Sequence, residues 1–202
     1  MSQKDFINGS IFEFKVPNEL GFAYCKIFDF RYIREIDGTL GRVYNYIVDT
    51  PIKNIDVLRD KDWLFGARRL AGLPNSRGRG AWKFKGVLIS ANDNVIPDFK
   101  YAPKMFPLIE DESTIKEWYV IKNIREMSSS PVAYEQIKHL EDTSINSQYG
   151  IEIRTAMEFY RHKGIDASLN FDMEDLANSN IYHTMINVPL YNSALGDKAL
   201  ID

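Results

Sequence analysis

The first half of the chain is dominated by short segments rich in aromatic and β-branched residues, and turn-forming residues separate these segments. Such residues suit the pleated surface of a β-sheet. Clusters of Pro, Asn, Asp and Gly lie at 17–21, 37–38 and 49–51, where they favour tight turns. The pattern therefore predicts a meander of antiparallel strands at 10–16, 22–30 and 41–49, with a further strand at 82–89.

The predicted strand at 82–89 alternates between apolar and charged residues. Trp82 and Phe84 are interleaved with Lys83 and Lys85. This period of two is typical of a strand with one face against a core and the other in water. We therefore expect the sheet to have one wetted face.

Beyond residue 110 the apolar spacing changes to that of a helix, although 118–122 still predicts a strand. The clearest helix is predicted at 150–163, where apolar residues recur at i, i+3, i+4 and i+7 and so share one face. Gly164 follows, and glycine is common just beyond the end of a helix. The apolar residues are Ile153, Ala156, Met157 and Tyr160.

A second helix is predicted at 131–140. Ser130 is a favoured N-cap, and Pro131 suits the first helical position. Three apolar residues lie on one face at i, i+4 and i+7. They are Ala133, Ile137 and Leu140.

Together these elements predict an α+β fold, with a curved antiparallel sheet or partial barrel in the N-terminal part, packed by helices from the C-terminal part. We expect residues 1–165 to form this domain and residues 166–202 to form an extension packed on it. In the extension, Asp172 could cap a short helix through Ala177, and Pro189 excludes a continuous helix later.

The composition excludes several kinds of site. The chain has 202 residues and one cysteine, Cys25, so an intrachain disulfide and a multi-thiolate zinc site are both ruled out. Cys25 lies in a predicted strand among aromatic residues, which is typical of a core thiol. His139, His162 and His183 lack the spacing of metal ligands. We expect neither a metal nor a cofactor.

The sequence also predicts where the protein resides. Lys4 and Asp5 stand where a secretory leader needs an apolar stretch. The longest run without charged residues, 176–196, contains several asparagines and a proline, which makes it too polar to span a bilayer. With one cysteine, a reducing compartment fits best. We therefore expect a cytoplasmic protein with no membrane contact.

Charge is divided unevenly along the chain. Residues 1–109 carry 17 Lys and Arg against 12 Asp and Glu, whereas residues 110–202 carry 8 against 16. Clusters of carboxylates suit a basic partner because they accelerate encounter and fix register. A solvated face is the alternative interpretation. One cluster comprises Glu110, Asp111, Glu112 and Glu117, and the other comprises Asp172, Glu174 and Asp175.

A basic segment lies at 68–85. Six basic residues and no acidic residue occur between Trp63 and Asn92, and glycines separate some of them. Guanidinium groups can fork onto phosphate, and an aromatic ring can stack on a base. A flexible hairpin loop is the alternative interpretation. The phosphate-binding residues would be Arg77, Arg79, Trp82, Lys83 and Lys85.

Three motifs follow one another along the chain. A Gly-led strand at 8–14 precedes a strand at 21–27 that contains Gly and Tyr, WKFKG stands at 82–86, and YGIEIR at 149–154 opens the last predicted helix. In this order the motifs resemble the immunity protein 26 family, whose members are encoded beside toxins in bacterial polymorphic toxin systems. The resemblance covers residues 8–164 and implies an inhibitor of a cognate toxin.

These observations lead to two hypotheses. The first is a non-enzymatic bacterial immunity protein that neutralises a basic cognate toxin, with an aromatic anchor inside a charged rim. The alternative is a module that binds nucleic acid or a phosphorylated ligand through the basic segment at 68–85. The toxin-binding residues of the first hypothesis would be Glu110, Asp111, Glu112, Glu117 and Trp118.

Overall fold

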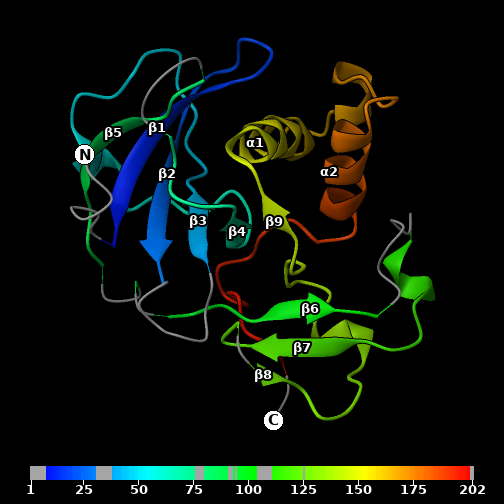
Figure 1. Cartoon of the computed structure of the whole chain (residues 1–202). Helices are drawn as coiled ribbons and strands as arrows, with labels where there is room; N and C mark the ends of the chain where they lie inside the picture. Colours follow the sequence, from blue (N-terminus) through cyan, green and yellow to red (C-terminus); the bar gives the residue numbers. More distant parts are fainter. Residues whose placement is uncertain are drawn as a thin grey trace.

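The computed structural model describes residues 8–30, 38–75, 80–90, 93, 95–103, 111–124 and 126–200. It contains a six-stranded sheet, a three-stranded sheet and two α-helices, which confirms the predicted α+β class and curved sheet. In Figure 1, α1 (Gln148–His162) lies beside the large sheet, α2 (Leu176–Ile186) lies on the far side of α1, and the small sheet lies below them.

The large sheet has the order β5-β1-β2-β3-β4-β9. Its first five strands are antiparallel neighbours, which confirms the predicted antiparallel pairing, although β4 itself was not predicted. β9 pairs in parallel with β4 and makes the sheet mixed. Between β4 and β9 the chain forms β5 and the whole small sheet, so the local sequence does not predict that β4 and β9 pair. The strands are β1 (Ser10–Val16), β2 (Gly21–Asp29), β3 (Thr39–Val43), β4 (Arg68–Leu70), β5 (Lys83–Val87) and β9 (Ile145–Asn146).

The small sheet has the order β6-β7-β8. Only its central strand was predicted, because β7 alone has a run of apolar residues. Lys100 in β6 also forms a parallel bridge with Asp142, shortly before β9. The strands are β6 (Phe99–Tyr101), β7 (Tyr119–Lys122) and β8 (Glu126–Met127).

The expectation of one wetted sheet face is wrong for β1 and β2. In β1 every residue except Lys15 is buried. One face packs against α1 (Gln148–His162) through residues such as Phe14 and Ile151. The opposite face packs against the chain around η2 (Ile55–Leu58), which provides the buried Leu58. The segment between β3 and β4 therefore covers the face expected to meet water.

The chain beyond β3 departs from the predicted strand at 41–49. β3 ends at Val43, and Tyr44 instead forms an isolated bridge with Trp63. Val48 forms a second bridge, with Phe22 at the start of β2. The backbone thus crosses the end of the sheet and does not continue along it.

Gly21, where β2 begins, is required by this crossing. Its φ is +103°, and a Cβ atom there would lie 2.3 Å from the carbonyl oxygen of Val48. We expect Gly21→Ala to lower the free energy of unfolding by about 1–3 kcal/mol because the residue would be strained and would displace backbone. Urea unfolding tests this. Gly38→Ala is the matched control, since nothing lies within 4 Å of its added methyl, and an equal loss in both variants would contradict the explanation.

The helix predicted at 150–163 is confirmed as α1, which begins two residues earlier because Ser147 accepts a hydrogen bond from the Gly150 N–H. The prediction at 131–140 is wrong. There the chain forms only the 3₁₀ turn η5 (Tyr134–Gln136) followed by further turns. Its apolar residues Ile137 and Leu140 are buried against the small sheet, so the same spacing is satisfied without an α-helix.

The C-terminal part contains a longer helix than predicted. α2 spans Leu176–Ile186, and Asp175, in place of Asp172, caps it by accepting a hydrogen bond from the Ala177 N–H. The short turn η6 (Ala167–Asn170) connects α1 to this region. Within the described part of the chain, neither helix is long and apolar enough to cross a membrane.

Residues 191–200 form an irregular tail that contacts both sheets. The Asp98 N–H donates to the Asp197 carbonyl at 2.7 Å, beside β6, and the Leu200 N–H donates to the Gln136 carbonyl at 3.1 Å. The Asp197 carboxylate pairs with Arg42 of β3 at 2.5 Å. The tail therefore joins the large sheet to the small one.

Candidate functional site

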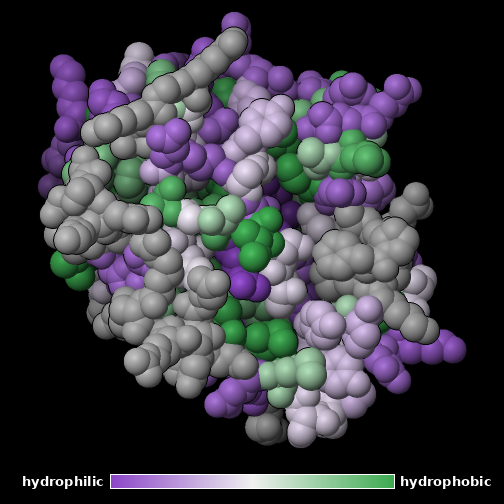
Figure 2. Space-filling model, viewed as in Figure 1, coloured by the Kyte–Doolittle hydropathy of each residue, from purple (hydrophilic) through white to green (hydrophobic). Residues whose placement is uncertain are grey.

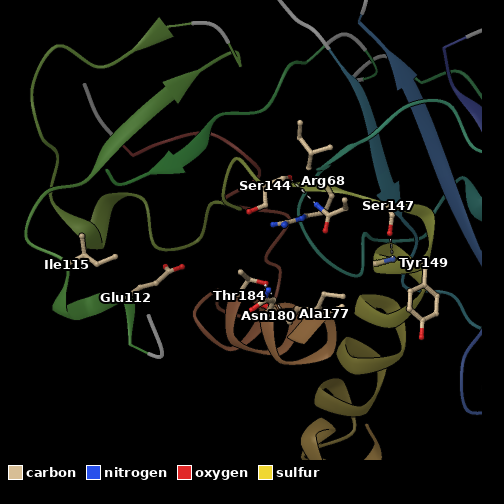
Figure 3. A pocket seen from close by; sticks show the side chains of 13 residues that line it. Arg68, Glu112, Ile115, Ser144, Ser147, Tyr149, Ala177, Asn180 and Thr184 are labelled. Carbon is tan, nitrogen blue, oxygen red and sulfur yellow. Dashed lines mark hydrogen bonds between the residues drawn. The ribbon is translucent and has the colours of Figure 1, made fainter. Parts of the chain in front are cut away.

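A hollow of about 260 Å³ lies where α2 faces the junction of β9 and α1, and we call it the α2 groove. Figure 3 shows α2 along one side, Ser147 and Tyr149 at the end near α1, and Glu112 and Ile115 at the opposite end. The groove thus runs from the large sheet to η4 (Glu112–Thr114), beside the small sheet. Its lining residues are Arg68, Glu112, Ile115, Ser144, Ile145, Asn146, Ser147, Tyr149, Gly150, Ala177, Asn180, Ile181 and Thr184.

One wall is a face of α2 made of small and medium-sized residues. Ala177, Asn180, Ile181 and Thr184 follow the i, i+3, i+4, i+7 spacing of one helical face. The neighbouring face of α2, which includes Met185, packs against α1. Ile181 lines the groove and also packs against the core cluster of Met185, so the groove receives the side of α2 that borders the core.

The opposite wall comes from the edge of the large sheet. β9 is the last strand of that sheet, and its Ile145 is 60% exposed. Tyr149, in the first turn of α1, is 59% exposed. Two large side chains with apolar surface thus stand at the groove without burial in this chain, which is typical of residues that meet a partner.

The floor of the groove is occupied by Arg68, whose side chain is 3% exposed. Its guanidinium donates to Glu141 at 2.7 Å and to Asp142 at 3.1 Å. Burial alone would raise the pKa of Asp142, but the charge of Arg68 and hydrogen bonds from Ser144 outweigh it and hold this pKa well below its usual range.

The same ion pairs extend behind the floor into α1. Arg154 contacts Glu141 at 3.3 Å and Glu158 at 2.9 Å, and all three side chains are buried. Burial raises the pKa of Glu158 against the opposing charges of Arg154 and Arg161. Because every charge in this chain of ion pairs has an opposite partner, the network serves to hold β4, α1 and the 141–142 segment together.

Glu112 closes the far end of the groove. Its carboxylate pairs with Lys100 at 2.5 Å and accepts a hydrogen bond from the Tyr134 hydroxyl at 3.3 Å. Burial raises the pKa of Glu112, and the nearby Lys100 opposes that change. Glu112 is therefore committed to an internal pair, although it lines the hollow.

Exposed carboxylates stand at both ends of the groove. Asp111 and Glu117 flank the η4 end, while Asp172, Glu174 and Asp175 precede α2. The sequence contains no Lys or Arg between Lys163 and Lys198, so no basic residue of this stretch balances the second group. The exposed Lys116 also lies at the η4 end, but carboxylates outnumber it there, so ligands that carry positive charge are favoured at both ends.

Two leucines project near the start of α2. Leu169 is 81% exposed and Leu176 is 77% exposed, although apolar residues of this size gain by burial. Over α2, Figure 2 shows a few hydrophobic side chains set among hydrophilic ones. This corner of the molecule therefore offers apolar contact inside an acidic surrounding.

The structure separates the five residues predicted to bind a toxin. Asp111 and Glu117 are exposed, and Asp111 also caps η4 by accepting the Ser113 N–H. Glu112 is buried in its pair with Lys100. The proposed anchor Trp118 is 1% exposed in a core cluster, so its ring is not part of the surface. Glu110 lies outside the described residues.

The basic segment does not form one surface. Trp82 is 1% exposed, stacks on Phe14 with ring centroids 4.6 Å apart, and donates its indole N–H to Glu152, so it cannot stack on a base. Lys85 pairs with Glu13 at 3.1 Å. Only Lys83 of the described predicted residues is exposed. Arg77 and Arg79 lie outside the described residues.

Sequence reasoning missed most of the residues that line the groove. Asn146, Asn180 and Thr184 are polar residues in otherwise unremarkable stretches, and only the fold brings them together. The exposed Leu169 and Leu176 could have been suspected from their position beside Asp172, Glu174 and Asp175. Arg68 was noted as one of the basic residues, but its burial depends on carboxylates more than 70 positions away.

In the described part of the chain, the side chains are not arranged to bind a metal ion or to act as a nucleophile. No group of three or more His, Cys, Asp or Glu side chains there is placed to hold a metal ion. Cys25 is buried, and burial raises the pKa of its thiol far above the usual value. A protonated, enclosed thiol is a poor nucleophile.

Comparisons of the chain with protein-family models, with curated proteins and with solved structures found no match.

Proposed function

We propose that this protein is a non-enzymatic bacterial immunity protein, which binds a basic cognate toxin in the cytoplasm and neutralises it. The α2 groove is the proposed contact site. The observation that supports this proposal best is the position of the groove between two exposed acidic groups. A bound toxin segment would be held at both ends by charge and in the middle by apolar contact.

The charge pattern favours a basic partner. Exposed carboxylates at both ends raise the association rate with a cationic protein and fix its orientation, even where each ion pair adds little affinity. Many proteins that act on nucleic acids have such cationic surfaces. A nuclease-type toxin would therefore be a suitable partner.

The exposed apolar residues favour a protein surface over a small solute. Ile145, Tyr149, Leu169 and Leu176 are all more than half exposed. Interfaces gain most of their affinity from a few such residues inside a polar rim, and tyrosine is enriched among them. We therefore assign Tyr149 the anchoring role that the sequence suggested for Trp118.

The state of the ionisable groups supports binding without chemistry. Arg68 and Glu112, the two charged residues of the groove lining, are each committed to buried partners. General acid–base catalysis needs a group that can exchange a proton with a substrate. Groups locked in ion pairs suit a rigid binding surface better.

Reversing one charge at each end of the groove tests the proposal. We expect Glu117→Lys/Glu174→Lys to lower affinity for the toxin encoded beside this protein at least 100-fold, and to abolish protection of cells that produce the toxin. Both side chains are exposed, so folding should be unchanged. Calorimetry at fixed salt gives the affinity, and a growth assay gives the protection.

Asp49→Lys/Asp60→Lys provides the matched control. Both residues are exposed, and the variant changes the net charge by the same amount away from the groove. It should retain protection. Equal loss of affinity in the two variants would show that only total charge matters, and full affinity in Glu117→Lys/Glu174→Lys would remove the groove as the contact site.

A further inference from the structure

A second and larger hollow, of about 580 Å³, lies on the large sheet beside the tail, and we call it the tail hollow. Five parts of the chain distant in sequence line it: β2, β3 with the adjoining Tyr44, residues 59–63, residues 88–90 with 93 and 95, and residues 191–198. Its volume lies within the usual range for small-molecule sites. It shares no lining residue with the α2 groove.

The floor of the tail hollow is built from two fixed ion pairs. Lys26, whose side chain is 1% exposed, contacts Asp93 at 2.6 Å and the Ser90 hydroxyl at 3.2 Å. Arg42 pairs with Asp197 at 2.5 Å. Burial lowers the pKa of Lys26, although Asp93 opposes this change. These pairs place two cationic donors at the floor without a net charge.

The mouth carries three further cations against one lining carboxylate. Arg59, Lys61 and Lys198 line the hollow together with Asp62. Lys61 lies over the ring of Tyr46 at 5.0 Å. Altogether five cationic side chains and three carboxylates line the hollow, so the excess positive charge is at its entrance.

Two mouth cations have carboxylate partners outside the hollow, and only the partner of Arg59 is exposed. Arg59 pairs with Asp56 at 2.9 Å, but Asp56 is 56% exposed and would stay hydrated without Arg59. Such exposed pairs contribute about 0–1 kcal/mol, so Arg59 can turn toward an incoming anion. Lys198 is held in place, because it pairs with Asp98, which is 7% exposed, and donates to the Asn123 side-chain oxygen at 2.6 Å.

Apolar and aromatic surface lies next to these cations. Trp63 packs against Tyr44 with ring centroids 4.4 Å apart and is partly exposed. Ile89 is 68% exposed and Val95 is 47% exposed at the rim. An inorganic anion would leave this surface in water, whereas an anion on an organic body would cover it.

We propose that the tail hollow binds a small phosphate monoester with an aromatic or apolar body. The phosphate would lie between Arg59 and Lys61, where guanidinium and ammonium donors suit its oxygens, and the body would cover Trp63. A dianionic phosphate gains more from the charges of Arg59 and Lys61 than a monoanionic carboxylate does. This site is independent of the proposed toxin contact.

Tryptophan fluorescence can follow binding, because Trp82 and Trp118 are each 1% exposed and Trp63 is the tryptophan at the hollow. The probes are adenosine monophosphate and phenyl phosphate, compared with inorganic phosphate, adenosine and benzoate. We expect saturable binding of both monoesters below about 1 mM at low salt, with inorganic phosphate at least tenfold weaker. The relative affinities of the two monoesters show whether the hollow prefers a nucleotide or a simpler aromatic phosphate.

Arg59→Ala/Lys61→Ala should weaken monoester binding at least tenfold, and Trp63→Phe should remove the fluorescence change while calorimetry still detects binding. Lys15→Ala/Lys53→Ala removes two exposed lysines that do not line the hollow and should leave affinity unchanged. Three results would overturn the proposal. They are no saturable binding of either monoester, equal affinity for adenosine and its monophosphate, and equal weakening by both double variants.

Discussion

Replacing Arg68 with methionine is expected to lower the free energy of unfolding by about 3–5 kcal/mol. The guanidinium is 3% exposed and neutralises two carboxylates that are themselves buried, Glu141 and Asp142. Methionine fills much of the same volume, so the loss would come from the two charges left without their partner. Arg154 would still contact Glu141, but Asp142 would retain only its hydrogen bonds from Ser144.

Urea unfolding followed by circular dichroism measures this loss. Arg59→Met is the control, because the pair between Arg59 and Asp56 is more than half exposed and should contribute less than about 1 kcal/mol. A loss below about 1 kcal/mol in Arg68→Met would mean that water reaches the carboxylates, and the network would then not be the buried support of the α2 groove.

Trp118→Ala is expected to lower the free energy of unfolding by about 3–5 kcal/mol, as for other large core truncations. The indole packs among Val120, Ile137 and Leu140, and its ring centroid lies 5.2 Å from that of Tyr134. Lys100 lies over the same ring at 5.8 Å and also pairs with Glu112. Removing the indole would therefore open a cavity and loosen the η4 end of the groove.

Comparison of Tyr149→Ala with Trp118→Ala distinguishes an aromatic residue that binds the toxin from one that stabilises the fold. Tyr149 is 59% exposed, so its removal should change the free energy of unfolding by no more than about 0.5 kcal/mol while it weakens toxin binding. Thermal and urea unfolding of both variants, with binding measured in parallel, test the distinction. A stable Trp118→Ala variant with impaired binding would restore Trp118 as the contact residue.

The first strands could be predicted closely because their own residues determine them. β1 has the predicted bounds, and β2 begins one residue before the prediction, at Gly21. β4, β6 and β9 have two or three residues each and form only through pairing with distant partners. A local pattern of alternation cannot develop over so short a length, so these strands had no signal to detect.

The helix predictions differ for a physical reason. In α1 the apolar spacing covers two full turns, from Ile153 to Tyr160, and agrees with a cap and a following glycine. At 131–140 three apolar residues suggested a helix, but burial of Ile137 and Leu140 against the small sheet is achieved by turns. α2 contains asparagine, serine and threonine, which are weak helix formers, so helix propensity does not predict it. Packing against α1 stabilises this helix instead.

The site was harder to predict than the fold because charge alone does not reveal burial. Asp111 and Glu112 are neighbours in sequence, yet the first is exposed and the second is enclosed with Lys100. The acidic character of the second half was informative, since carboxylates do flank the groove. The groove is formed by segments that lie far apart in the sequence, so no single stretch of sequence predicts it.

The tail has a consequence for how the two sheets lose their structure. Arg42, Asp98 and Gln136 all obtain partners from residues 197–200. Local opening of this short irregular segment would break these contacts at the same time. The tail therefore couples the unfolding of the large sheet to that of the small sheet.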